Sequence, residues 1–257
     1  MKKRILSALV LAPSLILLVF LFKKIGLWAI LLTSALLAHR ELFKLLIGTS
    51  PFFLLFLSSL PLIGALGGVW GFLLGSWMAL FFASLYAFRV PSFEEALKRF
   101  SLFGFGLVYL NLPLFYFWEI SELPDGFLWL LGLTLSIWCG DSFALFVGRA
   151  WGRRSLAPKI SPKKTIEGGL ATFLGVGLGF VCLKLLLLPN ISWRALAFIV
   201  LGVGFLSQVG DLSESLIKRA SGAKDSGGLI PGHGGILDRM DSFIFTAPFL
   251  YYFLRFS

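Results

Sequence analysis

Charge is scarce in this sequence. Asp, Glu, Lys and Arg make up 14% of its 257 residues, whereas a soluble domain carries about 25%. Apolar residues reach 58%, and the mean hydropathy is +0.90. A water-soluble globule of this size could not bury so much Leu and Phe, because much of its surface faces water. The same excess excludes disorder, and 28 Gly with 11 Pro exclude a coiled coil. The sequence therefore predicts an all-α, polytopic membrane protein.

Cysteine is almost absent as well. Cys139 and Cys182 are the only two, and each lies inside an apolar run. Neither has the spacing of a metal-binding motif, so the sequence supports no disulfide framework and no thiolate-bound metal.

The apolar runs predict a bundle of about nine membrane-spanning helices, since each crossing needs about 20 residues. They lie at Ile5–Phe22, Gly26–Leu42, Phe52–Gly68, Val69–Phe88, Phe103–Trp118, Phe127–Val147, Gly168–Leu188, Trp193–Ser213 and Ile236–Phe253. The first run is interpreted as a span rather than a signal peptide, because Lys23 and Lys24 follow it directly without a small-residue cleavage site.

The distribution of cations predicts which side each loop faces. With the N-terminus in the cytoplasm, the cytoplasmic side carries 18 of the 23 Lys and Arg residues, as the positive-inside rule requires. The net charge of +10 is accordingly attributed to this bias and to attraction for anionic lipid and phosphate. No nucleic-acid partner is expected.

Small residues recur at four-residue spacing in two regions. The patterns are Gly64-x3-Gly68, Gly67-x3-Gly71-x3-Gly75 and Gly175-x3-Gly179. Such faces let helix backbones approach closely in lipid, so these segments are predicted to make close helix contacts.

One polar stretch begins at Asp141, within an apolar span. An ionised carboxylate there costs about 2.5–3.5 kcal/mol, so it should face an ion-pair partner such as Arg149, or a functional, water-filled cavity. The basic loop that follows has two interpretations. It is either a solvated positive-inside loop near lipid headgroups, or a phosphate-binding segment, because Lys163 and Lys164 directly precede a predicted helix start.

The second polar stretch is more specific. Asp211, Ser215 and Lys218 are spaced by four and three residues and share a helix face, with Glu214 adjoining. Asp238 and Asp241 share a face of the next helix in the same way. The Gly-rich segment between them would allow close approach of a ligand to the backbone. Carboxylates beside basic groups at the cytoplasmic helix ends are the ligands that magnesium and phosphates require.

The segment from Ser215 to Asp241 resembles the signature of the phosphatidate cytidylyltransferases, also called CDP-diacylglycerol synthases. Its Ser-x-x-Lys-Arg, Lys-Asp, His-Gly-Gly and Asp-Arg-x-Asp elements stand in matching register. An upstream block, Asp141-Ser142 and residues 156–168, is also similar. Leu145 and Ile166 depart from the family pattern, which has bulkier aromatic residues there, but neither is an expected ligand.

The resemblance implies transfer of CMP from CTP to phosphatidic acid, giving CDP-diacylglycerol and pyrophosphate. It implies Mg²⁺ held by Asp211 and Asp238, and it suggests a second cation, for which K⁺ is a candidate. The further catalytic residues would be Asp241, Asp141 and Lys224, with Glu214 as an additional ligand or orienting group. Phosphate binding would fall to Lys163, Lys164, Lys218, Arg219, Lys224, His233 and Arg239.

The resemblance also implies a division of labour along the chain. Residues 1–120 would form scaffold helices, including candidate dimer contacts, and residues 121–257 the catalytic helices, with cytoplasmic loops at 149–167 and 214–236. A homodimer is expected on the same ground. The cation distribution predicts an active site that faces the cytoplasm, and the lack of secretory and organellar signals in the sequence predicts the plasma (inner) membrane.

Two other functions remain open from the residues alone. A different cytidylyl- or phosphotransferase of membrane lipids, such as an isoprenoid-alcohol kinase, could use a similar site of carboxylates and basic residues. An ion-coupled transporter could use Asp141, although a transporter more often shows matching repeats in two halves, whereas here the polar residues concentrate in one half.

Overall fold

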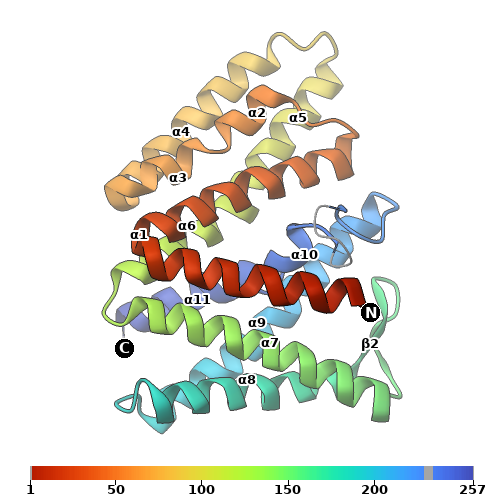
Figure 1. Ribbon diagram of the computed structural model, residues 1–257. Helices are drawn as coiled ribbons and strands as arrows, with labels where there is room; N and C mark the ends of the chain where they lie inside the picture. The colour runs from red at the N-terminus through yellow and green to blue at the C-terminus, as the bar shows by residue number, and fades with distance from the viewer. Residues whose placement is uncertain (1, 229–233, 257) are drawn as a thin grey trace. The chain divides into compact units, whose positions relative to one another are not determined.

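A computed structural model describes residues 2–228 and 234–256, with side chains described from residue 21 onward. The described chain is nearly all-α (Figure 1). It divides into two compact units. One comprises Met1–Trp118 with Ala220–Met240, and the other comprises Glu119–Arg219 with Asp241–Ser257. Each unit is therefore built from two stretches that are separated along the sequence.

The elements follow one another in this order. The chain forms α1 (Lys2–Ile47), α2 (Phe52–Leu57), α3 (Leu60–Gly64), the 3₁₀ turn η1 (Ala65–Gly67), α4 (Gly68–Ala87), α5 (Phe93–Gly106), the π-helical segment η2 (Leu107–Asn111), α6 (Leu112–Glu122), α7 (Gly126–Trp151), β1 (Ser155–Ala157), β2 (Ser161–Thr165), α8 (Ile166–Leu186), α9 (Trp193–Ala220), α10 (Leu237–Met240) and α11 (Phe243–Phe256).

Within the described residues, six helical stretches are long and apolar enough to cross a membrane. They are Leu21–Ile47, Phe52–Ala87, Phe93–Glu122, Gly126–Trp151, Ile166–Leu186 and Trp193–Ala220. Many of their large apolar side chains are exposed, among them Trp70, Phe146 and Leu174. These helices confirm the prediction of a helical membrane protein.

The stretch Phe52–Ala87 has 36 residues, more than one crossing needs. The chain turns at Gly68, where φ is +69°, and α4 then packs along α3 (Figure 1). A Cβ on Gly64 would overlap the carbonyl of Gly71, and a Cβ on Gly75 would lie against Leu60. The predicted close contact is thereby confirmed for Gly64, Gly71 and Gly75, and it joins two helices of the first unit. Gly67 and Gly68 instead lie at the turn, where an added Cβ would meet nothing within 4 Å.

In the second unit α7 and α8 lie side by side along their lengths (Figure 1). A Cβ on Gly175 would lie 2.5 Å from the Cys139 carbonyl oxygen, and one on Gly179 would lie 2.5 Å from Cα of Ser136. The second glycine pattern therefore also marks a close helix–helix contact, as predicted.

The all-α prediction needs one correction. The loop expected at 149–167 contains the antiparallel pair β1–β2, in which Ser155 pairs with Thr165. Lys163 and Lys164 lie on β2, where alternate side chains point to opposite faces. Thr165 then starts α8, because its hydroxyl accepts a hydrogen bond from the Gly168 amide at 3.1 Å.

Two predicted boundaries also differ from the observed ones. Residues 214–220, expected to open a cytoplasmic loop, continue α9 as helix. The run Ile236–Phe253, expected to be one continuous helix, is interrupted at Asp241 and Ser242, between α10 and α11. Both departures concern the polar residues of the signature.

Candidate metal and phosphate site

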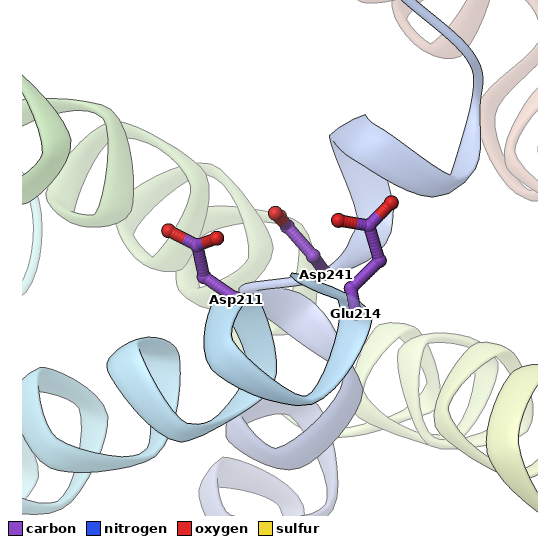
Figure 2. A group of neighbouring side chains, drawn as sticks. All are labelled: Asp211, Glu214 and Asp241. Carbon is purple, nitrogen blue, oxygen red and sulfur yellow. The ribbon is translucent and has the colours of Figure 1, made fainter. Parts of the chain in front are cut away.

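Three carboxylates of the second unit lie together. Asp211 and Glu214 project from α9, and Asp241 lies at the turn that precedes α11. Each offers an oxygen within 4.8 Å of the others, and Figure 2 shows the three carboxyl groups on the same side of α9. The turn can approach because residue 210 is glycine, since a Cβ there would overlap the Asp241 carbonyl oxygen.

Two lysines neutralise part of this negative charge. Lys164 on β2 forms an ion pair with Asp211, and Lys218 forms one with Glu214, one helical turn away on α9. Glu214 is almost fully buried, with 1% of its surface exposed. Asp241 interacts electrostatically with Lys164 and also with Asp141 of α7. The cluster thus joins residues from four separate segments of the sequence.

The β-hairpin is tied to α9 near this cluster. The Arg219 guanidinium of α9 donates a hydrogen bond to the Ile160 carbonyl at 3.1 Å. The Arg154 amide donates one to Glu167 of α8 at 3.4 Å. Lys163, the neighbour of Lys164, is exposed. The two predicted phosphate-binding lysines therefore differ, because Lys164 lies in the carboxylate cluster while Lys163 faces solvent.

The donor set fits a hard divalent cation. Mg²⁺ prefers carboxylate oxygens, uses few of them from the protein, and leaves other positions for water and substrate phosphates. Three carboxylates within 4.8 Å also repel one another. The two lysine ammonium groups reduce this repulsion here, as a bound cation would.

The other predicted site residues lie around this cluster or in the first unit. Asp141, which interacts with Asp241, is exposed, and so is Arg219. In the first unit Lys224 and Arg239 are exposed, and Asp238 is half-buried on α10. His233 lies outside the described residues.

Asp238 lies in a hydrogen-bonded network within the first unit. Its Oδ2 accepts hydrogen bonds from the Ser226 amide at 3.1 Å, the Ser226 hydroxyl at 2.8 Å and the Gly235 amide at 2.8 Å. A second carboxylate, Glu41 of α1, accepts from the same hydroxyl at 3.1 Å. Glu41 was not among the predicted site residues. The available signal was a carboxylate within a candidate membrane span, next to His39 and Arg40, because acidic residues in such spans are rarely without function.

The comparisons with known proteins agree with these observations. The model of the cytidylyltransferase family matches residues 2–257. A phosphatidate cytidylyltransferase of Bacillus subtilis is 35% identical over 261 aligned residues, which cover 87% of this chain and 96% of that protein.

Two further relatives match a shorter region. A phosphatidate cytidylyltransferase of Synechocystis is 45% identical over 56% of this chain and 51% of its own length. One of Thermotoga maritima is 38% identical over 65% of this chain and 63% of its own length. The full-length family match and the nearly complete coverage of the Bacillus subtilis relative show that this chain belongs to the cytidylyltransferase family.

Proposed function

We propose that this protein is a phosphatidate cytidylyltransferase, which transfers CMP from CTP to phosphatidic acid and releases pyrophosphate. The observation that carries the proposal is the cluster of Asp211, Glu214 and Asp241 in a chain similar to enzymes of that name over nearly its full length. Lys164 and Lys218 pair with this cluster, so it combines carboxylates for a metal with cations for phosphates.

The chemistry suits a site without a strong general base. A phosphate monoester has a second pKa of about 6, so phosphatidic acid is largely ionised near neutral pH. One of its phosphate oxygens forms a bond to the α-phosphorus of CTP, while the bond from that phosphorus to the bridging oxygen breaks and pyrophosphate leaves. The obstacle is repulsion between two anions, so positive charge and alignment supply most of the catalysis.

Asp211, Asp241 and Glu214 would hold Mg²⁺, which when bound neutralises charge on the triphosphate and on the leaving group. In the structure Lys164 and Lys218 are paired with two of these carboxylates. Beside a metal held by these carboxylates, the ammonium groups of Lys164 and Lys218 would bind substrate phosphates.

The remaining assignments rest on the resemblance and stay proposals. Asp238 is proposed as a metal ligand, Asp141 and Lys224 as catalytic residues, and K⁺ as a second cation. Lys163, Arg219, His233 and Arg239 are proposed to bind phosphate.

We further propose nine membrane crossings, with the N-terminus and the active site on the cytoplasmic side of a plasma membrane, and a homodimer. The cation distribution along the sequence supports the orientation. Residues 1–120 are proposed as scaffold and residues 121–257 as the catalytic part. Access of CTP from the cytoplasm would follow from this arrangement.

The decisive experiment is pyrophosphate release by the detergent-purified protein. It is measured with CTP in the presence of phosphatidic acid or phosphatidylcholine, and with Mg²⁺ or EDTA. We expect release only when CTP, phosphatidic acid and Mg²⁺ are present together.

Folded protein that releases no pyrophosphate under those conditions would contradict the proposal. CTP-dependent phosphorylation of an isoprenoid alcohol, with CDP as the nucleotide product, would instead indicate the lipid kinase.

A further inference from the structure

Glu41 connects the first helix to the signature segment near the other end of the chain. It lies on α1, and 7% of its surface is exposed. Its Oε1 accepts a hydrogen bond from the Ile236 amide at 3.0 Å, and its Oε2 accepts one from the Leu237 amide at 3.0 Å. Oε2 also accepts from the Ser226 hydroxyl at 3.1 Å. Both carboxylate oxygens are therefore used by donors of the signature segment.

The Ser226 hydroxyl joins Glu41 to Asp238. It lies 3.1 Å from the Glu41 carboxylate and 2.8 Å from the Asp238 carboxylate, and 6% of the Ser226 surface is exposed. The Ser226 and Gly235 amides also donate to Asp238. The two carboxylates thus hold together Ser226 and residues 235–237, which lie at opposite ends of the Gly-rich segment.

Three glycines of this segment lie against protein carboxylates, Gly227 and Gly235 against Glu41 and Gly234 against Asp238. A Cβ on Gly235 would overlap both the Glu41 carboxylate and the Ser226 hydroxyl, and a Cβ on Gly227 would lie 2.9 Å from Oε1 of Glu41. Gly234 has φ +80°, a conformation that L side chains rarely adopt. The backbone therefore approaches a carboxylate of the protein itself at these glycines, where the sequence pattern had indicated approach to a ligand.

We propose that Glu41 is a positioning residue for the cytidylyltransferase site. It accepts hydrogen bonds from the amides at the start of α10 and from the Ser226 hydroxyl, and thereby fixes the backbone of this segment. Asp238 lies on that segment, and Asp241 follows it directly in the sequence. The expected effect of Glu41 on catalysis rests on the proposed function. That Glu41 holds the signature segment in place does not depend on the reaction.

The burial of Glu41 argues against a role in packing alone. A carboxylate within a candidate membrane span is costly, and a Gln or Met of similar length would fill the same space more cheaply. An anionic side chain with two acceptor oxygens is required only because two amides and a hydroxyl converge on it.

The test compares Glu41→Gln with Glu94→Gln as the matched control, because Glu94 is an exposed glutamate of the same unit. Gln keeps the size of the side chain but replaces one acceptor oxygen by a donor NH₂, which cannot accept from an amide. Four quantities are measured: hydrogen exchange of peptides that contain Ile236 and Leu237, the Mg²⁺ concentration for half-maximal activity, kcat, and the KM for CTP.

For Glu41→Gln we expect at least about tenfold faster exchange at Ile236 and Leu237. We also expect a higher Mg²⁺ requirement, and a kcat about 10- to 100-fold lower, the range found when groups that orient metal ligands are removed. The KM for CTP at saturating Mg²⁺ should change less than kcat. Glu94→Gln should match the wild type in every measurement.

Unchanged exchange at Ile236 and Leu237 in Glu41→Gln would overturn the proposal. So would a loss of activity that only follows a fall in the folded fraction, measured by thermal unfolding of the same samples. If the wild type shows no cytidylyltransferase activity, the proposed function fails while the exchange result still decides whether Glu41 holds the segment. Glu41→Asp has a side chain one methylene shorter. Its exchange protection at Ile236 and Leu237 should lie between that of Glu41→Gln and that of the wild type.

Discussion

Asp211 pairs with Lys164 in this structure, although the family resemblance assigns the aspartate to a metal and the lysine to a phosphate. The two assignments are compatible because a lysine ammonium and a metal ion both neutralise a carboxylate. The same reasoning applies to Glu214 and Lys218. Either cation would reduce the repulsion among the three carboxylates.

Substitution of Asp211 by Asn tests its role as a metal ligand. Asn keeps the shape of the side chain but removes the charge, so Mg²⁺ binding should weaken and turnover should fall by more than about 100-fold, beyond the loss expected for an orienting group. The measurement is pyrophosphate release as a function of Mg²⁺ concentration. Asp125→Asn is a suitable control, because Asp125 is an exposed residue of the α6–α7 connection with φ 55°, which Asn tolerates.

A variant Asp211→Asn that retains more than a tenth of wild-type turnover, with an unchanged Mg²⁺ requirement, would exclude Asp211 as a ligand. Asp238→Asn should also lower turnover. It differs in one respect, because Asp238 accepts hydrogen bonds from Ser226 and Gly235. Its loss should therefore also accelerate hydrogen exchange in the signature segment, which Asp211→Asn should leave unchanged.

At the residue scale the sequence predicted part of the carboxylate cluster. Helical spacing put Glu214 beside Asp211, and the family signature includes Asp241, and the structure brings these three together. The family resemblance had paired Asp211 with Asp238 for Mg²⁺, but Asp238 lies in the other compact unit, so its role as a ligand stays a prediction. Glu41 was missed because its hydrogen bonds join positions separated by 185 to 196 residues, and helical periodicity carries no information at that distance.

At the scale of elements, the close contact between α7 and α8 supports the basic hairpin. These helices are joined through β1 and β2, which carry Lys163 and Lys164. The glycine spacing of α8 predicted this contact, since small residues allow close approach in lipid. The hairpin itself was not predicted, because its strands have three and five residues, too few to show a reliable alternation of polar and apolar residues.

Gly179→Ala tests this helix contact. The added methyl group would lie 2.5 Å from Cα of Ser136, so α7 and α8 must separate, and overpacking of this kind typically costs about 1–3 kcal/mol. We expect a lower midpoint of thermal unfolding in detergent and lower activity. Gly177→Ala is the matched control, because its methyl group would lie 3.6 Å from Val200, an ordinary contact. Equal unfolding midpoints for the two variants would contradict the argument.

At the scale of the whole molecule, composition alone predicted a helical membrane protein, but the number of crossings depends on where helices turn. Phe52–Ala87 is one apolar stretch of 36 residues that turns at Gly68. Helix α1 contains a break at Lys23, where φ is 49° and ψ is −125°. Hydropathy alone does not locate such turns, because the residues on both sides of them are equally apolar. Both positions are nevertheless predicted span boundaries, because Gly67 and Gly68 mark the first and Lys23 and Lys24 mark the second.

The proposed orientation can be measured by cysteine labelling in intact cells. Cys139 and Cys182 are first replaced by Ala, and single cysteines are then introduced at Lys98, Asp125, Lys159 and Arg194. The positive-inside distribution predicts that a membrane-impermeant maleimide labels positions 125 and 194 in intact cells, and labels positions 98 and 159 only after permeabilisation. Labelling of positions 98 and 125 from the same side would refute a crossing between them. The reverse pattern at all four positions would place the carboxylate cluster on the outer side, away from cytoplasmic CTP, and would contradict the proposed enzyme as well as its topology.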